Sequence, residues 1–175
     1  RSLAEESVKK IFAEIDTPVA GTWRQRVLPG CLNESDQDAC VRETRELAIK
    51  TGVPKESVES VVQWTVSLFG LRGPAVFEIM RQCPQATELP PLIGNSGLPT
   101  AAAVFVIEKE WAMSLGDLIE RRLMLIFEPQ LSLSTLHGLA DVLVVMGLLK
   151  QSDRESTIAA EIIRLQDCYG KEIIS

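Results

Sequence analysis

The sequence has few of the residues that most often bind metals or catalyse reactions. Its 175 residues include one histidine, His137, and four cysteines, none of them in a Cys-x-x-Cys pair. Structural zinc sites are built from closely spaced Cys and His side chains, so no zinc site is expected. No nucleophile lies at a recognisable distance from His137, and we expect that side chain to bridge to a neighbour rather than to act in catalysis.

Motifs that hold nucleotides or calcium are also missing. The sequence contains no Gly-x-Gly-x-x-Gly, no P-loop, no His-Glu-x-x-His and no calcium-loop pattern. Each of these motifs places glycines or ligating side chains where a phosphate or a metal must be held. Catalysis by this chain alone is therefore not expected, and the sequence assigns no catalytic, cofactor-binding or metal-binding residue.

Charge and hydropathy exclude two further classes of partner. The formal net charge is −6, the pI is about 4.9 and the basic residues are scattered, whereas a nucleic-acid surface needs clustered Lys and Arg. The longest apolar candidate, residues 89–107, is interrupted by prolines and glycines, and a membrane span needs roughly 20 apolar residues. We expect no nucleic-acid partner and no transmembrane segment. The start, at an arginine, carries no signal peptide pattern, and the chain is expected to be a piece of a longer protein.

Aromatic residues are scarce, and this favours a helical core. They make up 5% of the chain, against 46% hydrophobic residues in total, so the core must consist mainly of Leu, Ile, Val and Ala. Cys31 and Cys40 could form a small disulfide in an oxidising compartment, but free thiols are favoured because a domain of this length needs no covalent staple.

Apolar residues recur at helical spacing along most of the chain, and the segments between them carry Pro, Gly or capping residues. We predict an all-α fold: a single compact helical bundle of about eight helices, with an irregular N-terminal arm and no strand. Residues 1–34 form the first helix and the arm, and residues 35–175 form the helical domain. The helices are expected at about residues 3–15, 35–51, 54–70, 73–82, 101–113, 115–126, 132–149 and 152–170.

The most clearly specified helix start lies at Ser114. Asp117 follows three residues later, directly before an apolar pair, which is the pattern of a capping box. This predicts that Ser114 and Asp117 form a structural cap and that a helix begins at Leu115. A second pattern of this type, Ser152 with Glu155, predicts the start of the last helix.

Arg121 and Arg122 follow this helix start and have two interpretations. An adjacent pair of arginines can bind a carboxylate or a phosphate in a forked geometry. Alternatively, Arg121 pairs with Asp117 at the i, i+4 spacing on the helix surface, and both arginines are structural. Adjacent residues point about 100° apart on a helix, so Asp117 cannot equally reach Arg122. The pair is a candidate contact with another domain through Arg122.

The same stretch resembles a known signature. The run from Glu110, Glu-x-Ala-x-Ser-Leu-x-Asp-Leu-x-x-Arg-Arg, resembles the Glu-x-Ala-x-Thr-Leu-x-Asp-x-Leu-x-Arg-Arg run of FAD-dependent glycerol-3-phosphate dehydrogenases and α-glycerophosphate oxidases, in their C-terminal helical domain. Leu68-Phe69-Gly70 with Arg72 resembles the Leu-x-Tyr-Gly-x-Arg helix end of that family. Residues 1–30, which close in Leu-Pro-Gly, resemble the segment that joins the flavin domain to the helical domain. The chain departs from the family at Ala102, Phe105 and Leu123, where Glu, Tyr and Thr are common, and these changes are expected to remove polar groups from an interface.

The resemblance implies a non-catalytic C-terminal domain of a flavoenzyme that oxidises glycerol 3-phosphate to dihydroxyacetone phosphate and passes electrons to quinone or oxygen. FAD would be held by the missing N-terminal flavin domain of the same polypeptide, and this chain itself would hold no cofactor. The implied location is cytoplasmic, including the inner face of the membrane, where the parent would lie peripherally. The alternative is a free-standing helical module that binds a protein partner through an exposed apolar patch.

Overall fold

A computed structural model describes residues 2–17, 34–128 and 131–174. Within these ranges the chain is mostly helical, which confirms the predicted all-α class. The α-helices of this part of the chain are α1 (Ser2–Glu14), α2 (Glu34–Lys50), α3 (Val58–Phe69), α4 (Gly73–Gln82), α5 (Thr100–Glu110), α6 (Leu133–Val145) and α7 (Arg154–Tyr169). The arm expected between α1 and α2 lies outside the described residues from 18 onward, as do Cys31 and the Leu-Pro-Gly of the resemblance.

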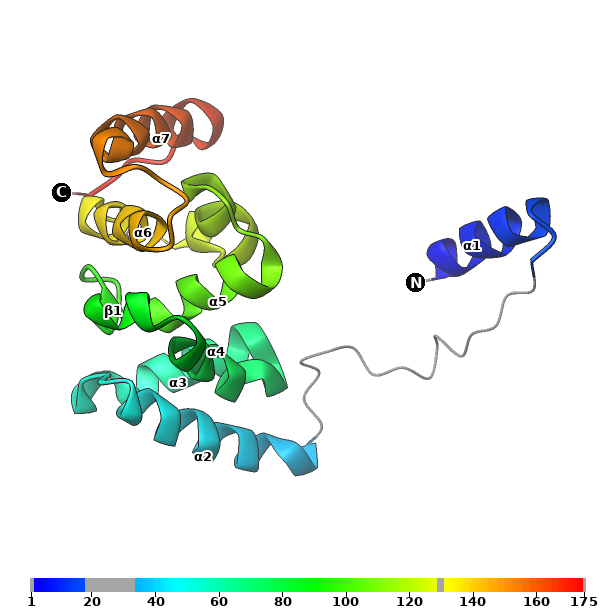
Figure 1. Cartoon of the computed structure of the whole chain (residues 1–175), viewed down its shortest axis with the longest axis horizontal. Coiled ribbons are helices and arrows are strands. Elements are labelled where there is room, and N and C mark those ends of the chain that lie inside the picture. Colours follow the sequence, from blue (N-terminus) through cyan, green and yellow to red (C-terminus); the bar gives the residue numbers. More distant parts are fainter. Residues whose placement is uncertain (1, 18–33, 129–130, 175) are drawn as a thin grey trace.

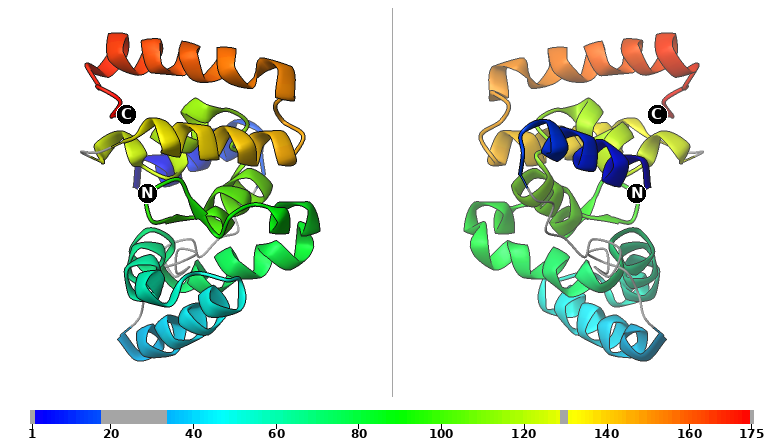
Figure 2. Two further views of the ribbon diagram at one scale, coloured as in Figure 1. Left: turned by 90° about the vertical axis from the view of Figure 1, so that its left-hand side faces the viewer. Right: turned by 90° about the vertical axis from the view of Figure 1, so that its right-hand side faces the viewer.

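The helices from α2 to α7 are stacked in the order in which they occur along the chain. Figure 1 shows α2, α3 and α4 at one end of the stack, α5 in the middle, and α6 and α7 at the other end. The views in Figure 2 show the same succession from two sides. Neighbouring helices in this order contact one another: α2 packs against α3 and α4, α4 against α5, α5 against α6, and α6 against α7. The main body is therefore built from local contacts.

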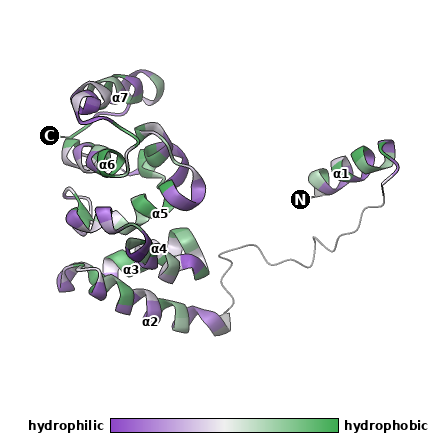
Figure 3. Cartoon of the chain, viewed as in Figure 1, coloured by the Kyte–Doolittle hydropathy of each residue, from purple (hydrophilic) through white to green (hydrophobic). Residues whose placement is uncertain are grey.

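Helix α5 is the centre of the hydrophobic core. Every residue from 101 to 107 is buried, so this helix has no solvent-facing side over its first two turns. Figure 3 shows hydrophobic residues along most of α5, whereas hydrophilic residues alternate with them along α2 and α7. The core side chains are mainly Val, Leu, Ile and Ala, as the composition predicted. A helix that is apolar on all sides is stable only when elements cover it on all sides.

The connection between α4 and α5 contains a short hairpin, which corrects the prediction that the chain has no strand. A 3₁₀ turn, η4 (Pro84–Glu88), is followed by β1 (Leu92–Ile93) and β2 (Leu98–Pro99), which pair antiparallel. Two-residue strands are too short to show the alternation by which a sequence reveals a strand. The hairpin packs on α6, where a Cβ added at Gly138 would lie 2.6 Å from a methyl carbon of Ile93, so only glycine allows this approach.

The helix predicted from Leu115 to Ile126 is shorter and less regular than expected. It is helical from residue 115, becomes a π-helix in η5 (Asp117–Arg122), and ends at Leu123. A separate 3₁₀ turn, η6 (Leu125–Phe127), follows Met124, whose φ of 57° is in the left-handed region. The wider π-turn and this left-handed residue divide a segment whose apolar spacing predicts one continuous helix.

The starts of α6 and α7 differ in how they are capped. Ser132 caps α6, because its hydroxyl accepts a hydrogen bond of 3.2 Å from the Thr135 N–H. The capping box predicted at Ser152 is wrong: its hydroxyl donates to the Asp153 carboxylate, and α7 begins at Arg154 after the 3₁₀ turn η7 (Gln151–Asp153). After α7 the chain returns to the start of α6 (Figure 2), where the Leu133 N–H donates to the Ile174 carbonyl over 2.7 Å.

Candidate functional site

The candidate site is the corner of the stack where α5 ends and η5 begins. Helix α5 stops at Trp111, which adopts a left-handed conformation with φ of 56° and is 84% exposed. A bulky residue at positive φ is unusual, and its conformation must be held by its surroundings. The Ala112 N–H, which donates to the Val106 carbonyl over 3.2 Å, fixes the turn. The result is a large aromatic side chain that projects into solvent.

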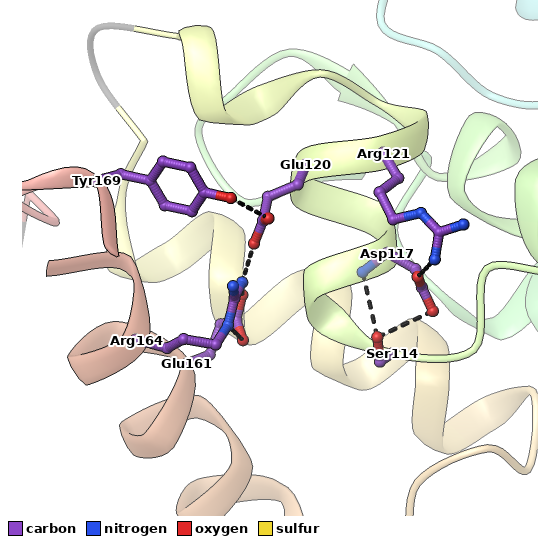
Figure 4. A network of polar contacts seen from close by, with 7 residues as sticks. All are labelled: Ser114, Asp117, Glu120, Arg121, Glu161, Arg164 and Tyr169. Atoms are coloured by element: carbon purple, nitrogen blue, oxygen red, sulfur yellow. Dashed lines mark hydrogen bonds and ion pairs between the residues drawn. The ribbon is translucent and has the colours of Figure 1, made fainter. Parts of the chain in front are cut away.

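Ser114 and Asp117 form the predicted cap geometry in the next turn (Figure 4). The Ser114 hydroxyl accepts a hydrogen bond of 3.1 Å from the Asp117 N–H and donates to the Asp117 carboxylate. That carboxylate also accepts from the Met113 N–H at 3.0 Å and from Arg121 at 2.8 Å. Burial alone would raise the pKa of Asp117, but the Met113 and Ser114 hydrogen bonds and the Arg121 charge together lower it. The corner is therefore held by an ionised Asp117 at neutral pH.

Glu110 joins the two arginines that the sequence placed in separate motifs. Its carboxylate lies 2.8 Å from Arg72 and 3.8 Å from Arg122, and its side chain is 20% exposed. The Arg72 guanidinium also lies over the Phe105 ring, 4.8 Å from its centroid. Arg122, which Asp117 cannot equally reach, thus has a partner within the chain. The helical spacing from Asp117 did not indicate this partner, because Glu110 lies before the predicted helix start.

A second ionic network attaches the π-helix to α7. Glu120 accepts hydrogen bonds from Arg164 and from the Tyr169 hydroxyl, the latter at 2.6 Å (Figure 4). Arg164 also bonds to Glu161, one turn earlier on α7. The Arg164 hydrogen bond is the main reason that the pKa of Glu120 is lowered, against the opposing effect of burial. No sequence motif indicated this network, because Glu120 lies 44 residues before Arg164 and 49 before Tyr169.

Large exposed apolar side chains recur along the segment from Trp111 to Phe127. Trp111 and Phe127 are 84% and 74% exposed, and Met113 and Met124 are 58% and 42% exposed. Arg121, whose side chain is 68% exposed, lies within the same segment. We call these five residues the 111–127 surface. Exposed aromatic and Met side chains with an arginine are the composition that protein interfaces favour.

The three departures from the family pattern lie elsewhere. Ala102, Phe105 and Leu123 are 0%, 3% and 2% exposed, so they belong to the core. Phe105 packs edge-to-face on Phe69 with ring centroids 5.5 Å apart. The expectation that these positions changed an interface is therefore wrong. Apolar residues at all three suit burial, which would penalise an unpaired carboxylate strongly.

His137 bridges to a neighbouring helix, as expected. Its Nδ1 lies 2.8 Å from an Arg154 nitrogen, and Arg154 also pairs with Asp141 over 2.6 Å. Cys40 and Cys83 are buried free thiols, and Cys40 Sγ lies 3.5 Å from the Gly70 carbonyl oxygen. Over residues 2–17, 34–128 and 131–174, no cluster of three or more His, Cys, Asp or Glu side chains is arranged to hold a metal ion. Within the same ranges, no helix is long and apolar enough to cross a bilayer.

Comparison with known proteins gives no relative. Protein-family models, curated proteins and solved structures each gave no match to the chain.

Proposed function

We propose that the chain is the non-catalytic C-terminal helical domain of an FAD-dependent enzyme that resembles glycerol-3-phosphate dehydrogenase. In this proposal the parent oxidises glycerol 3-phosphate to dihydroxyacetone phosphate, FAD accepts the hydride, and electrons pass to quinone or oxygen. The partner of the chain is the flavin domain of the same polypeptide, and the parent is cytoplasmic, including the inner face of the membrane. The residues of this chain contribute position and stability, and no chemical step is assigned to them.

One observation supports the proposal most directly: the two matching motifs meet in space. Arg72 comes from the Leu-Phe-Gly-x-Arg helix end, and Glu110 and Arg122 come from the longer run, and these three side chains form one ionic cluster. Residues that act as a structural unit favour a common fold over a chance match of two short patterns. The 111–127 surface starts at the residue next to Glu110.

The decisive experiment is to read the coding sequence that precedes Arg1. The proposal expects a β-strand followed by a Gly-x-Gly-x-x-Gly motif, which holds the pyrophosphate of FAD at a helix N-terminus. The protein encoded by the joined sequences should then purify with bound flavin and reduce an artificial electron acceptor when glycerol 3-phosphate is added. Glycerol and glycerol 2-phosphate serve as control substrates. An upstream sequence without this motif, or a flavin-loaded protein inactive with glycerol 3-phosphate, would contradict the proposal.

The 111–127 surface also favours the alternative, a helical module that binds a separate protein. A domain separated from its flavin partner and a free-standing module would both expose such a surface, so its exposure does not distinguish them. The upstream sequence does: a complete gene that starts near Arg1 supports the module. In that case the partner protein should be one whose binding to the chain depends on Trp111.

A further inference from the structure

Helix α1 presents an apolar stripe that no other described element covers. Leu3, Ile11 and Ile15 are 78%, 58% and 60% exposed, and with Val8 and Phe12 they recur at the spacing of one helix face. Figure 1 draws α1 apart from the stacked helices. An isolated helix of 13 residues is marginal in water, so this element needs a surface on which to bury its stripe.

The main body offers an open apolar groove of about 710 Å³ between the C-terminal half of α2, helix α4 and the segment before the hairpin. Its floor and walls include Leu47, Phe77, Met80 and Leu89. Among the described residues that line it there is no Asp or Glu, while Lys50 and Arg81 contribute two positive charges. Arg81 has one acidic neighbour, Glu78, at 3.8 Å, and both of these side chains are exposed.

Two of the three charged side chains nearest the stripe of α1 have the opposite sign. At 100° per residue, Glu14 falls between Leu3 and Ile11 at one edge of the stripe, and Glu5 lies next to Phe12 at the other edge. Lys10 lies next to Leu3, and Lys9 lies further round on the polar face. A helix that laid its stripe in the groove would thus direct carboxylates towards the rim that carries Lys50 and Arg81. Complementary charges around an apolar contact set the orientation of a docked helix.

The connecting chain is long enough for this contact within one molecule. Residues 15–33 separate α1 from α2, and a chain of this length spans at most about 65 Å. The groove lies at the far end of α2, about 25 Å from its start at a rise of 1.5 Å per residue. A tether of this length keeps the local concentration of α1 near the groove in the millimolar range, which favours docking in the same chain over docking in a second copy.

We propose that α1 docks by its apolar stripe into the groove between α2, α4 and the segment before the hairpin of its own chain. The occupant of the groove is thus a segment of the same polypeptide, and the docked helix covers apolar surface on both partners. This inference does not depend on the proposed enzyme family.

Methyl NMR of the full 175-residue chain tests the proposal. We expect nuclear Overhauser cross-peaks between the methyl groups of Ile11 and those of Leu47 and Met80. The Phe12→Asp variant should lose them, and the matched control Ala13→Asp, on the opposite face of α1, should keep them. Arg81→Glu should weaken them, and the added change Glu14→Arg should restore them.

Three results would overturn the proposal. The first is the absence of cross-peaks between α1 and the groove in the unmodified chain. The second is a set of cross-peaks from Ile11 to Met113 and Met124, which would place α1 on the 111–127 surface. The third is a cross-peak between two differently labelled samples of the chain after they are mixed. Such a cross-peak would place α1 in the groove of a second copy.

Discussion

At the residue scale, Ser114 fixes the point at which the helical segment after Trp111 begins. Its hydroxyl accepts from the Asp117 N–H, one of the N–H groups that have no partner within the helix. The Ser114→Ala variant should therefore lose roughly 0.5–2 kcal/mol of unfolding free energy, the range for removal of a helix cap. Urea unfolding followed by circular dichroism measures this loss.

The control is Ser67→Ala, whose hydroxyl bonds to the Trp64 carbonyl within α3 and caps no helix start. It should change stability little, because alanine is well suited to a helix interior. An unchanged unfolding midpoint in Ser114→Ala would show that the hydroxyl does not stabilise the helix start.

Glu110 has a larger role than its place at the end of α5 suggests. It is the shared partner of Arg72 and Arg122, and its neutralisation leaves two partly buried guanidinium groups without their carboxylate. We expect Glu110→Gln to lower the unfolding free energy by about 1 kcal/mol, between the values for an exposed ion pair and for a charged hydrogen bond. Glu108→Gln, an exposed position on the same helix, is the control in the same urea titration. Equal urea unfolding midpoints for the two variants would show that Glu110 does not stabilise the fold through Arg72 and Arg122.

At the scale of elements, the contact between η5 and α7 should make stability depend on pH. Arg164 lowers the pKa of Glu120 in the folded chain, so the folded state binds the proton less readily than the unfolded state. The stabilisation is present above the unfolded pKa of about 4.3 and is lost as the pH falls through the lower, folded pKa. Glu120→Gln should therefore destabilise the chain at pH 7, and its difference from the parent should shrink as the pH falls below about 4.

Urea unfolding of Glu120→Gln at several pH values from neutral to acid checks this expectation. Glu46→Gln, an exposed position on α2, serves as the control and should follow the parent at every pH. A difference between Glu120→Gln and the parent that stays constant with pH would mean that the loss comes from packing rather than from the carboxylate charge.

Helix positions were the most predictable elements, because they depend on local spacing. The helix ends expected near residues 51, 70 and 82 agree within a residue with α2, α3 and α4, where glycine or proline interrupts each pattern. The π-helix of η5 and the left-handed Met124 were not predictable, because tertiary packing rather than local propensity selects them. The Glu110 cluster was missed for a similar reason: a pairing between residues 38 positions apart leaves no periodic signal in the sequence.

At the scale of the whole molecule, the 111–127 surface has a different consequence for the chain alone and for the proposed parent. Trp111 is 84% exposed, so Trp111→Ala should leave the stability of the isolated chain nearly unchanged. If the flavin domain packs on this surface, the same change should lower the stability or activity of the joined protein, because a buried Trp is a frequent hot spot of interfaces. Arg122→Ala should follow the same pattern, with an added loss of up to about 1 kcal/mol in the isolated chain through Glu110.

Thermal unfolding of both proteins measures these differences, and Ile163→Ala is the control. Ile163 is 61% exposed on α7, outside the 111–127 surface. The interface proposal expects Trp111→Ala to affect only the joined protein and Ile163→Ala to affect neither. Equal losses from Trp111→Ala in the two proteins would make Trp111 an internal structural residue instead.

The stacking of helices in chain order also bears on how the protein is made. During synthesis the N-terminal elements emerge first and can fold as they appear. Helices α2, α3 and α4 contact one another and can pack before any later helix exists. Helix α5 is different, because its buried residues 101–107 are covered partly by α6. The ribosome has not yet synthesised α6 when α5 emerges. In the interval between the emergence of α5 and that of α6, the nascent chain therefore exposes part of its most fully buried helix to chaperones and to other chains.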